Sequence, residues 1–268
     1  MYAQLYFDYN ATTPCAKEVV DAMLPYFHED FGNPSSSHHP YGWLAKSAVE
    51  DATEAIAKNL GVSPRDLVYT SGSTESINMI LKGICKKYRE KGNHIITTKV
   101  EHKAVLDTCA FLEEDGFEIT YLDVGSDGLI RIEDFKSALR PETILVSIMY
   151  TNNETGIIQP LDEIATSTHE NGSLLFSDTT QALGKMPLDS VFGLLDFACF
   201  SGHKVYGPKG IGLTYIKGNA NYDKLPSLIQ GGGQQKGQRG GTINTPLIIG
   251  MSKAIEDAYE NLMEETKK

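Results

Sequence analysis

Short apolar runs alternate with helical patterns along this chain. Each run is rich in Val, Ile, Leu or aromatic residues and is bounded by polar or Gly-containing segments, which is typical of strands. The run TILVSIMY is apolar almost throughout and therefore predicts a strand buried on both faces. The sequence predicts strands at 67–70, 94–98, 118–122, 143–150, 174–178, 195–201 and 212–216.

Helical spacing of apolar residues fills several of the intervals between these runs. It predicts helices over 41–60, stopping at Gly61, from SGSTES to Lys87, and from the end of HIITT to about Gly116. Strands that alternate with helices imply crossover connections and a mainly parallel sheet with helices on both faces. The fold class is therefore α/β, and ligands are expected at the carboxyl ends of the strands.

Composition narrows the class of protein. A chain of 268 residues with 41% apolar residues can bury one large domain, and its formal net charge of -11 argues against a nucleic-acid-binding surface. No apolar run approaches the length of a membrane span, and the N-terminus lacks a signal-peptide pattern. The scattered cysteines form no CxxC pair and are expected to be reduced. We therefore expect a soluble, cytoplasmic protein that binds neither membrane nor nucleic acid.

A lysine follows the sixth apolar run in the sequence FSGHKVYGPKGIG. Lys204 stands there between a strand that looks buried and a turn rich in Gly and Pro. A lysine amine forms a Schiff base only when it is neutral and aimed at a carbonyl carbon, and partial burial favours the neutral form. The alternative is an ordinary surface lysine, and Lys209 in the same loop is a competing candidate.

An aspartate ends the run LLFSD, and Gln181 follows it closely. A carboxylate such as that of Asp178, held against a pyridine nitrogen, keeps the nitrogen protonated so that the ring can accept electrons. A helix cap or a turn would explain Asp178 equally well.

The segment SGSTES follows a strand and opens a helix. Ser73 or Thr74 would then lie at a helix N-terminus, where unpaired N–H groups and the helix dipole bind anions such as phosphate. The alternative is a plain capping box in which Glu75 reaches back to the backbone.

Other polar residues follow strands as well. His102 can stack on an aromatic ring or carry protons near neutral pH, and Asn153 can donate to a ring oxygen or form an Asx-turn. His28, His38 and His39 are not spaced as metal ligands, so no metal site is predicted.

Residues 231–242, GGGQQKGQRGGT, are too rich in glycine to pack as a regular element. They form either a flexible loop or a contact to phosphate or to a partner through Arg239 and Thr242.

Taken together, these segments resemble the cysteine desulfurase family, in the class-V branch of the fold-type-I pyridoxal-phosphate (PLP) enzymes. The motifs cover the chain from residue 5 to its end, in the order and with the spacing of the family. They are YFDYNATTP, FGNPSSSHHPYGW, TSGSTESIN, HIITTKVEHKAVLDTC, VSIMYTNNETGIIQP, SDTTQALGK, SGHKVYGPKGIG and GGGQQKGQRGGT. The chain departs from the family where RGGT replaces the usual R-S-G-T, so a serine contact is not expected there.

The resemblance assigns roles to individual residues. It implies that Lys204 is the Schiff-base lysine, that Asp178 pairs with the pyridine nitrogen, and that His102 stacks on the ring. Lys204 or His102 would move protons during the reaction. The resemblance also implies that Asn153 and Gln181 contact the ring hydroxyl and that Thr74, Ser201 and His203 hold the phosphate. Thr242 would join them from the partner subunit, and Ser73 remains a further candidate for the phosphate.

The resemblance also implies a function and a domain division. Residues 1–15 would belong with a small domain, 16–245 would form the PLP-binding large domain as a three-layer α/β/α fold with a seven-stranded sheet, and 246–268 would begin the helix that leads to the small domain. The substrate would be L-cysteine, the products L-alanine and an enzyme persulfide, and the protein a homodimer that passes sulfur to acceptor or scaffold proteins for iron–sulfur cluster or thio-modification pathways.

Neither the family's nucleophilic cysteine nor its arginine for the substrate carboxylate has a match in these 268 residues. None of the cysteines falls in a matching motif, namely Cys15, Cys85, Cys109 and Cys199. We therefore expect this chain to be inactive alone. The alternatives are a selenocysteine lyase, a class-V aminotransferase, or a catalytically silent module that binds PLP or dimerises.

Overall fold

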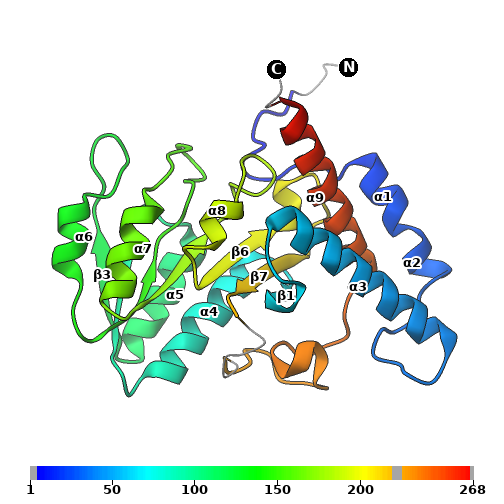
Figure 1. Ribbon diagram of the computed structural model, residues 1–268, viewed down its shortest axis with the longest axis horizontal. Coiled ribbons are helices and arrows are strands. Elements are labelled where there is room, and N and C mark those ends of the chain that lie inside the picture. Colours follow the sequence, from blue (N-terminus) through cyan, green and yellow to red (C-terminus); the bar gives the residue numbers. More distant parts are fainter. Residues whose placement is uncertain (1–4, 219–224, 266–268) are drawn as a thin grey trace.

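A mostly parallel sheet with helices on both faces organises the chain (Figure 1). The computed structural model describes residues 5–218 and 225–265. The strands follow the predicted runs: β1 Leu67–Thr70, β2 His94–Thr98, β3 Glu118–Leu122, β4 Thr143–Ser147, β5 Leu174–Asp178, β6 Phe197–Ser201 and β7 Gly212–Ile216. Their order in space is β1-β7-β6-β5-β4-β2-β3. The predicted fold class and seven-stranded sheet are therefore confirmed.

Strand direction decides which loops meet. β7 runs antiparallel to both β1 and β6, whereas the pairs β6–β5, β5–β4, β4–β2 and β2–β3 are parallel. β1 consequently points the same way as β6, and the carboxyl ends of all strands except β7 share one edge of the sheet. The first residue of β7, Gly212, pairs there with both Thr70 and Ser201.

Helices cover the two faces with separate cores. The helices are α1 Lys17–Met23, α2 Pro25–His28, α3 Pro40–Leu60, α4 Ser73–Tyr88, α5 Lys103–Glu114, α6 Ile132–Ala138, α7 Leu161–Glu170, α8 Asp189–Phe192 and α9 Thr245–Glu265. Alternate residues of β6 enter different cores: Phe197 and Cys199 pack with α4 and α5, whereas Ala198 and Phe200 pack with α3, α7 and α9. α3 and α9 lie side by side (Figure 1).

Two strands are shorter than their apolar runs. β6 begins at Phe197 instead of residue 195, and β4 ends at Ser147 instead of Tyr150. Beyond Ser147 the chain still pairs with β5, because the N–H groups of Ile148 and Tyr150 donate to the carbonyls of Phe176 and Asp178. Pairing with β2, on the other side of β4, stops at Thr97. The apolar run therefore extends over residues 148–150, which hydrogen-bond to a neighbouring strand on one side only.

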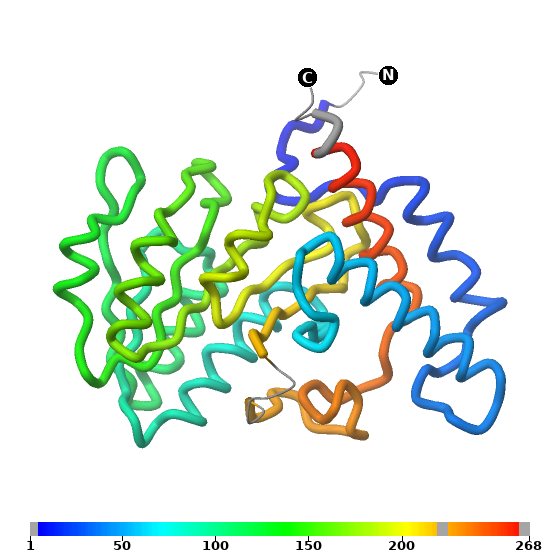
Figure 2. The backbone as a smooth tube through the Cα atoms, in the orientation of Figure 1, coloured from blue at the N-terminus to red at the C-terminus, as the bar shows by residue number. Residues whose placement is uncertain are grey.

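The glycine-rich segment is irregular, as predicted. It contains a short 3-10 turn, Gln234–Gly237, and forms the orange loop between the last strand and α9 (Figure 2). In the described part of the chain, no helix combines the length and apolarity needed to cross a membrane. The domain division at residues 15/16 and 245/246 stays a prediction, and its outer ends, 1–4 and 266–268, lie outside the described residues.

Candidate active site

Two adjoining cavities lie at the carboxyl edge of the sheet. The first, called the ring cavity below, has a volume of about 180 Å³ and is lined by the residues predicted to bind a pyridine ring. The second, the anion cavity, has a volume of about 360 Å³ and is lined by the residues predicted to bind a phosphate. Ser73, Thr74 and His203 line both. The first cavity also contains His102, Asn153, Asp178, Gln181 and Lys204, and the second contains Ser71, Gly72, Glu75, Ser201 and Lys209.

Lys204 ends a 3-10 turn, Gly202–Lys204, that directly follows β6. Its Nζ donates to the carbonyl of Asn10 and, at 2.9 Å, to that of Ala11. Burial lowers the pKa of Lys204 below its ordinary value, although the nearby carboxylates of Asp178 and Asp8 oppose the effect. A lowered pKa increases the neutral amine, which is the nucleophilic form of lysine.

Asp178 is the last residue of β5 and is 7% exposed. Its Oδ1 accepts a hydrogen bond from the N–H of Thr180 at 3.0 Å. The turn-forming role that the sequence left open is therefore real, and the same carboxylate also lines the cavity beside Lys204. Burial, reinforced by the neighbouring Asp178 carboxylate, raises the pKa of the Cys199 thiol.

His102 caps α5 and faces the same cavity. Its Nδ1 accepts from the N–H of Ala104 at 3.1 Å, which makes Nε2 the protonated nitrogen of the neutral ring. Glu101, directly before it, is 6% exposed. Its Oε1 accepts from the Thr98 hydroxyl and the Met149 N–H, each at 2.9 Å. Glu101 thus ties the turn that carries His102 to Met149, two residues beyond the end of β4.

Glu101 is a buried carboxyl group that the sequence analysis did not single out. Its Oε2 is buried without a hydrogen-bond partner in the structure as described. Burial raises the pKa of Glu101 to about 8, and the negative charge of Asp178 adds to the effect. The available signal was a carboxylate in KVEHKAV just after a buried strand, which is not specific by itself.

The loop predicted to bind an anion, residues 71–76, depends on a close approach between two backbones. α4 begins at Ser73 with Gly72 as its N-cap, and its first N–H groups have no acceptor within the helix. A Cβ added to Gly212 would lie 2.4 Å from the Gly72 Cα. A side chain at residue 212 would therefore push the loop away from the start of β7. Of the capping-box alternative, only the part played by Glu75 is present: its carboxylate accepts from the N–H of Ser71 at 2.8 Å, but the N-cap is Gly72 and no Ser or Thr side chain caps the helix. Binding of an anion by SGSTES stays a prediction.

The two amide residues of the site are engaged with other groups. Asn153 Nδ2 donates to Glu154 at 2.8 Å. The Gln181 amide donates to the Asn10 carbonyl at 3.0 Å and accepts from Lys185 Nζ at 2.6 Å. Both residues line the ring cavity, but their contact with a ring hydroxyl stays a prediction.

Of the remaining predicted phosphate ligands, two line the anion cavity and one does not. Ser201 and His203 line the anion cavity, and His203 Nδ1 lies 3.0 Å from the Thr12 hydroxyl. Thr242 is exposed and lines neither cavity within its own chain. Its predicted role from a partner subunit stays a prediction. Asn10 was not anticipated as a contact of Lys204, since only the long-range fold brings it there.

The cysteines occupy the elements predicted for them. Cys85 lies on α4, Cys109 on α5 and Cys199 on β6, all buried, while Cys15 is half-buried. Burial raises the pKa of each of these thiols. Across residues 5–218 and 225–265, no group of three or more His, Cys, Asp or Glu side chains is placed to hold a metal ion.

The donor set of the two cavities fits PLP. Hydroxyl groups and a helix N-terminus suit a phosphate, while a carboxylate, an imidazole and an amine of lowered pKa suit a pyridine aldehyde. The sheet with these groups at its carboxyl edge is the large domain of a fold-type-I PLP enzyme, and it matches NifS-like solved structures.

More particularly, the chain belongs to the aminotransferase class-V family, whose model matches residues 5–268. It is 48% identical over 263 residues to the cysteine desulfurase IscS of Rickettsia rickettsii (strain Iowa), covering 98% of this chain and 64% of that protein. A solved NifS-like protein superimposes with a TM-score of 0.92 at 41% identity, over 98% of this chain and 72% of the other. A structure described as SspA in complex with cysteine gives a TM-score of 0.90 at 41% identity, over 98% and 78%. The chain therefore spans about two thirds of the length of the curated relatives that it matches.

Proposed function

We propose that this chain is the cofactor-binding part of a cysteine desulfurase and that Lys204 bonds to PLP. The observation that carries the proposal is the convergence of Lys204, Asp178 and His102 on one cavity that adjoins the N-terminus of α4. The likeness of the chain to named cysteine desulfurases supports removal of sulfur from L-cysteine as the reaction. We infer a homodimeric cytoplasmic enzyme that passes sulfur to acceptor proteins.

The proposed reaction breaks the carbon–sulfur bond of L-cysteine. The sulfur passes to an acceptor thiol to give a persulfide, and the carbon that loses sulfur takes a proton, so that L-alanine is released. Bound PLP supplies the electron sink for this chemistry. Asp178 would hold the proton on the pyridine nitrogen, and the neutral Lys204 amine would carry protons to and from the substrate. His102 would exchange its proton at Nε2.

We propose that none of the four cysteines accepts the sulfur. Three are buried, and burial raises the pKa of all four thiols, which suppresses the nucleophilic thiolate. We therefore expect no persulfide on Cys15, Cys85, Cys109 or Cys199 after incubation with L-cysteine. Peptide mass spectrometry with alkylation of persulfides measures this, and modification of any of the four would contradict the assignment.

The cofactor site is tested by incubating the chain with PLP, reducing it with borohydride and mapping modified lysines. We expect one phosphopyridoxyl group, on Lys204 and not on Lys209. Lys204→Ala should abolish the stoichiometric adduct, whereas Lys136→Ala, an exposed lysine on α6, should leave it intact. A folded chain that gives no adduct, or an adduct elsewhere, would refute the site. Release of alanine from L-cysteine would show turnover by these 268 residues and refute the silent-module alternative.

A further inference from the structure

The wall of the anion cavity includes an acidic residue. Glu75 lies in the first turn of α4 and lines this cavity together with Ser73 and Thr74. An acidic side chain at a helix N-terminus is favourable in an empty site, but it occupies the positive end of the same dipole that a phosphate would use. It also repels a phosphate dianion. Lys209 also brings a positive charge to the wall of this cavity. A phosphate site that includes Glu75 is therefore favoured further if a second positive charge is held directly against the Glu75 carboxylate.

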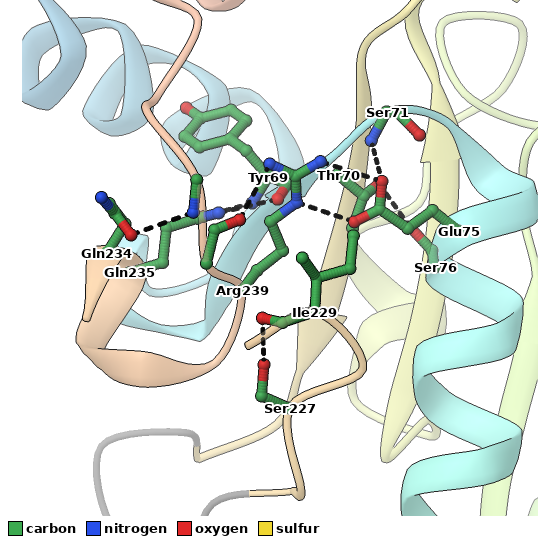
Figure 3. A network of polar contacts seen from close by, with 12 residues as sticks. Tyr69, Thr70, Ser71, Glu75, Ser76, Ser227, Ile229, Gln234, Gln235 and Arg239 are labelled. Carbon is green, nitrogen blue, oxygen red and sulfur yellow. Dashed lines mark hydrogen bonds and ion pairs between the residues drawn. The ribbon is translucent and has the colours of Figure 1, made fainter. Parts of the chain in front are cut away.

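Arg239 supplies this positive charge, and its guanidinium contacts both carboxylate oxygens of Glu75. Its Nε donates to Glu75 Oε1 at 2.8 Å and its Nη2 to Oε2 at 3.2 Å, in a two-point contact that Figure 3 shows. The side chains are 24% and 10% exposed, respectively, so water screens this pair weakly. Burial alone would raise the pKa of Glu75, but hydrogen bonds from Arg239 and Ser71 lower it, so the carboxylate is ionised at neutral pH.

The glycine-rich segment is anchored in a way that fixes Arg239. β1 is the edge strand of the sheet, and the side chain of Gln235 pairs with its outer edge as a backbone amide would. Gln235 Oε1 accepts from the Tyr69 N–H at 2.6 Å and Nε2 donates to the Tyr69 carbonyl at 2.8 Å (Figure 3). Gln235 itself has a positive φ of 48°, which costs conformational energy in a residue other than glycine. The segment is thus held to the strand that leads into the anion-binding loop.

We infer that Arg239 is a positioning residue that neutralises Glu75 and thereby keeps the start of α4 able to bind the phosphate group of the cofactor. The inference rests on the proposed function, because it assumes that PLP occupies the two cavities. The role differs from a direct phosphate contact: Arg239 acts through Glu75, and removal of the Glu75 charge should make it dispensable.

Binding of PLP and of pyridoxal, which lacks the phosphate, separates these roles. Each compound is titrated against the chain, and the bound fraction is trapped on Lys204 by borohydride. We expect Arg239→Gln to weaken PLP binding about tenfold or more, since it leaves a charged carboxylate beside the phosphate, and to change pyridoxal binding less than about twofold. Glu75→Gln should bind PLP at least as well as the wild type. The double variant Glu75→Gln/Arg239→Gln should recover most of the affinity lost in Arg239→Gln.

Arg89→Gln is the matched control. Arg89 pairs with Asp115 beyond the other end of α4, at 2.9 Å, and is remote from the anion cavity, so its replacement should leave the ratio of PLP to pyridoxal affinity unchanged. Arg239→Lys keeps the charge and should retain more PLP affinity than Arg239→Gln.

Three results would overturn the inference. The first is equal weakening of PLP and pyridoxal binding in Arg239→Gln, which would mean a merely structural role. The second is unchanged PLP binding in that variant. The third is a double variant as weak as Arg239→Gln, which would mean that Arg239 acts on the phosphate without Glu75. In each case wild-type labelling of Lys204 would leave the proposed function standing, whereas absence of wild-type labelling would remove both.

Discussion

Glu101→Gln tests whether the buried carboxyl group next to His102 is protonated in the folded protein. The ordinary pKa of a glutamate is 4.5, and burial raises that of Glu101 to about 8. A group whose pKa is raised on folding contributes its full stability below pH 4.5 and loses it as the pH rises through 8. The glutamine variant does not titrate, so the unfolding free energy of the wild type should fall relative to the variant as the pH rises.

The size of this change follows from the two pKa values. Between pH 5.5 and 7.5 an unfolded Glu101 is ionised while the folded one remains mostly protonated, so the difference should change by about 2 to 3 kcal/mol. Glutamine is a fair replacement because its amide oxygen can still accept from Thr98 and Met149, as Oε1 does.

Urea unfolding followed by circular dichroism at pH 5.5, 6.5 and 7.5 measures the effect. The exposed Glu114→Gln on α5 is the matched control for the change from carboxyl to amide, and the difference between the two variants isolates the buried site. A wild-type-minus-variant difference for Glu101 that stays constant from pH 5.5 to 7.5 would refute the argument. Glu101 would then be ionised in the folded protein over this pH range.

Three further changes probe the site and the sheet. Asp178→Asn should weaken PLP binding about tenfold or more, because a charge-assisted contact to the pyridine nitrogen becomes neutral; a PLP titration measures this. Gly212→Ala should lower the unfolding free energy by about 1 to 3 kcal/mol, because the new Cβ would lie 2.4 Å from the Gly72 Cα; urea unfolding of Gly193→Ala, where the nearest atom is 3.4 Å away, is the control. Burial, helped by Arg140, lowers the pKa of His94 to about 4, so the stability that this residue contributes above pH 6.5 should fall by about 3 kcal/mol as the pH drops towards 4. His94→Gln should remove this acid sensitivity, as measured by urea unfolding at pH 4 and pH 7. A variant that loses as much unfolding free energy on acidification as the wild type would contradict the prediction.

Local patterns determined most of the site's framework. The strand runs place Asp178, Lys204 and Ser73 just after strands or at their last residues, and parallel strands bring such positions to one edge. The assignment of these residues to one PLP site depended on the order of several motifs along the chain. A lysine, an aspartate or a capping-box loop alone has an ordinary structural explanation.

The sequence was less informative about what each polar group contacts. Asn153 and Gln181 reach the ring cavity, but their amides are bonded to Glu154, Lys185 and Asn10. Glu101 passed unnoticed because a single glutamate after a strand carries no periodic signal. Its contact with Met149, 48 residues away in the chain, forms only in the tertiary structure.

By itself the sequence determined the succession of strands and helices along the chain and the polar residues that follow each strand, because periodicity and turn residues act over a few neighbouring positions. The tertiary structure decided the contacts that complete the site. Lys204 meets Asn10 across 194 residues, Gln235 meets Tyr69 across 166, and Arg239 meets Glu75 across 164. Such contacts depend on the path of the whole chain, since no local pattern specifies which distant segment will arrive at a strand edge or a helix N-terminus.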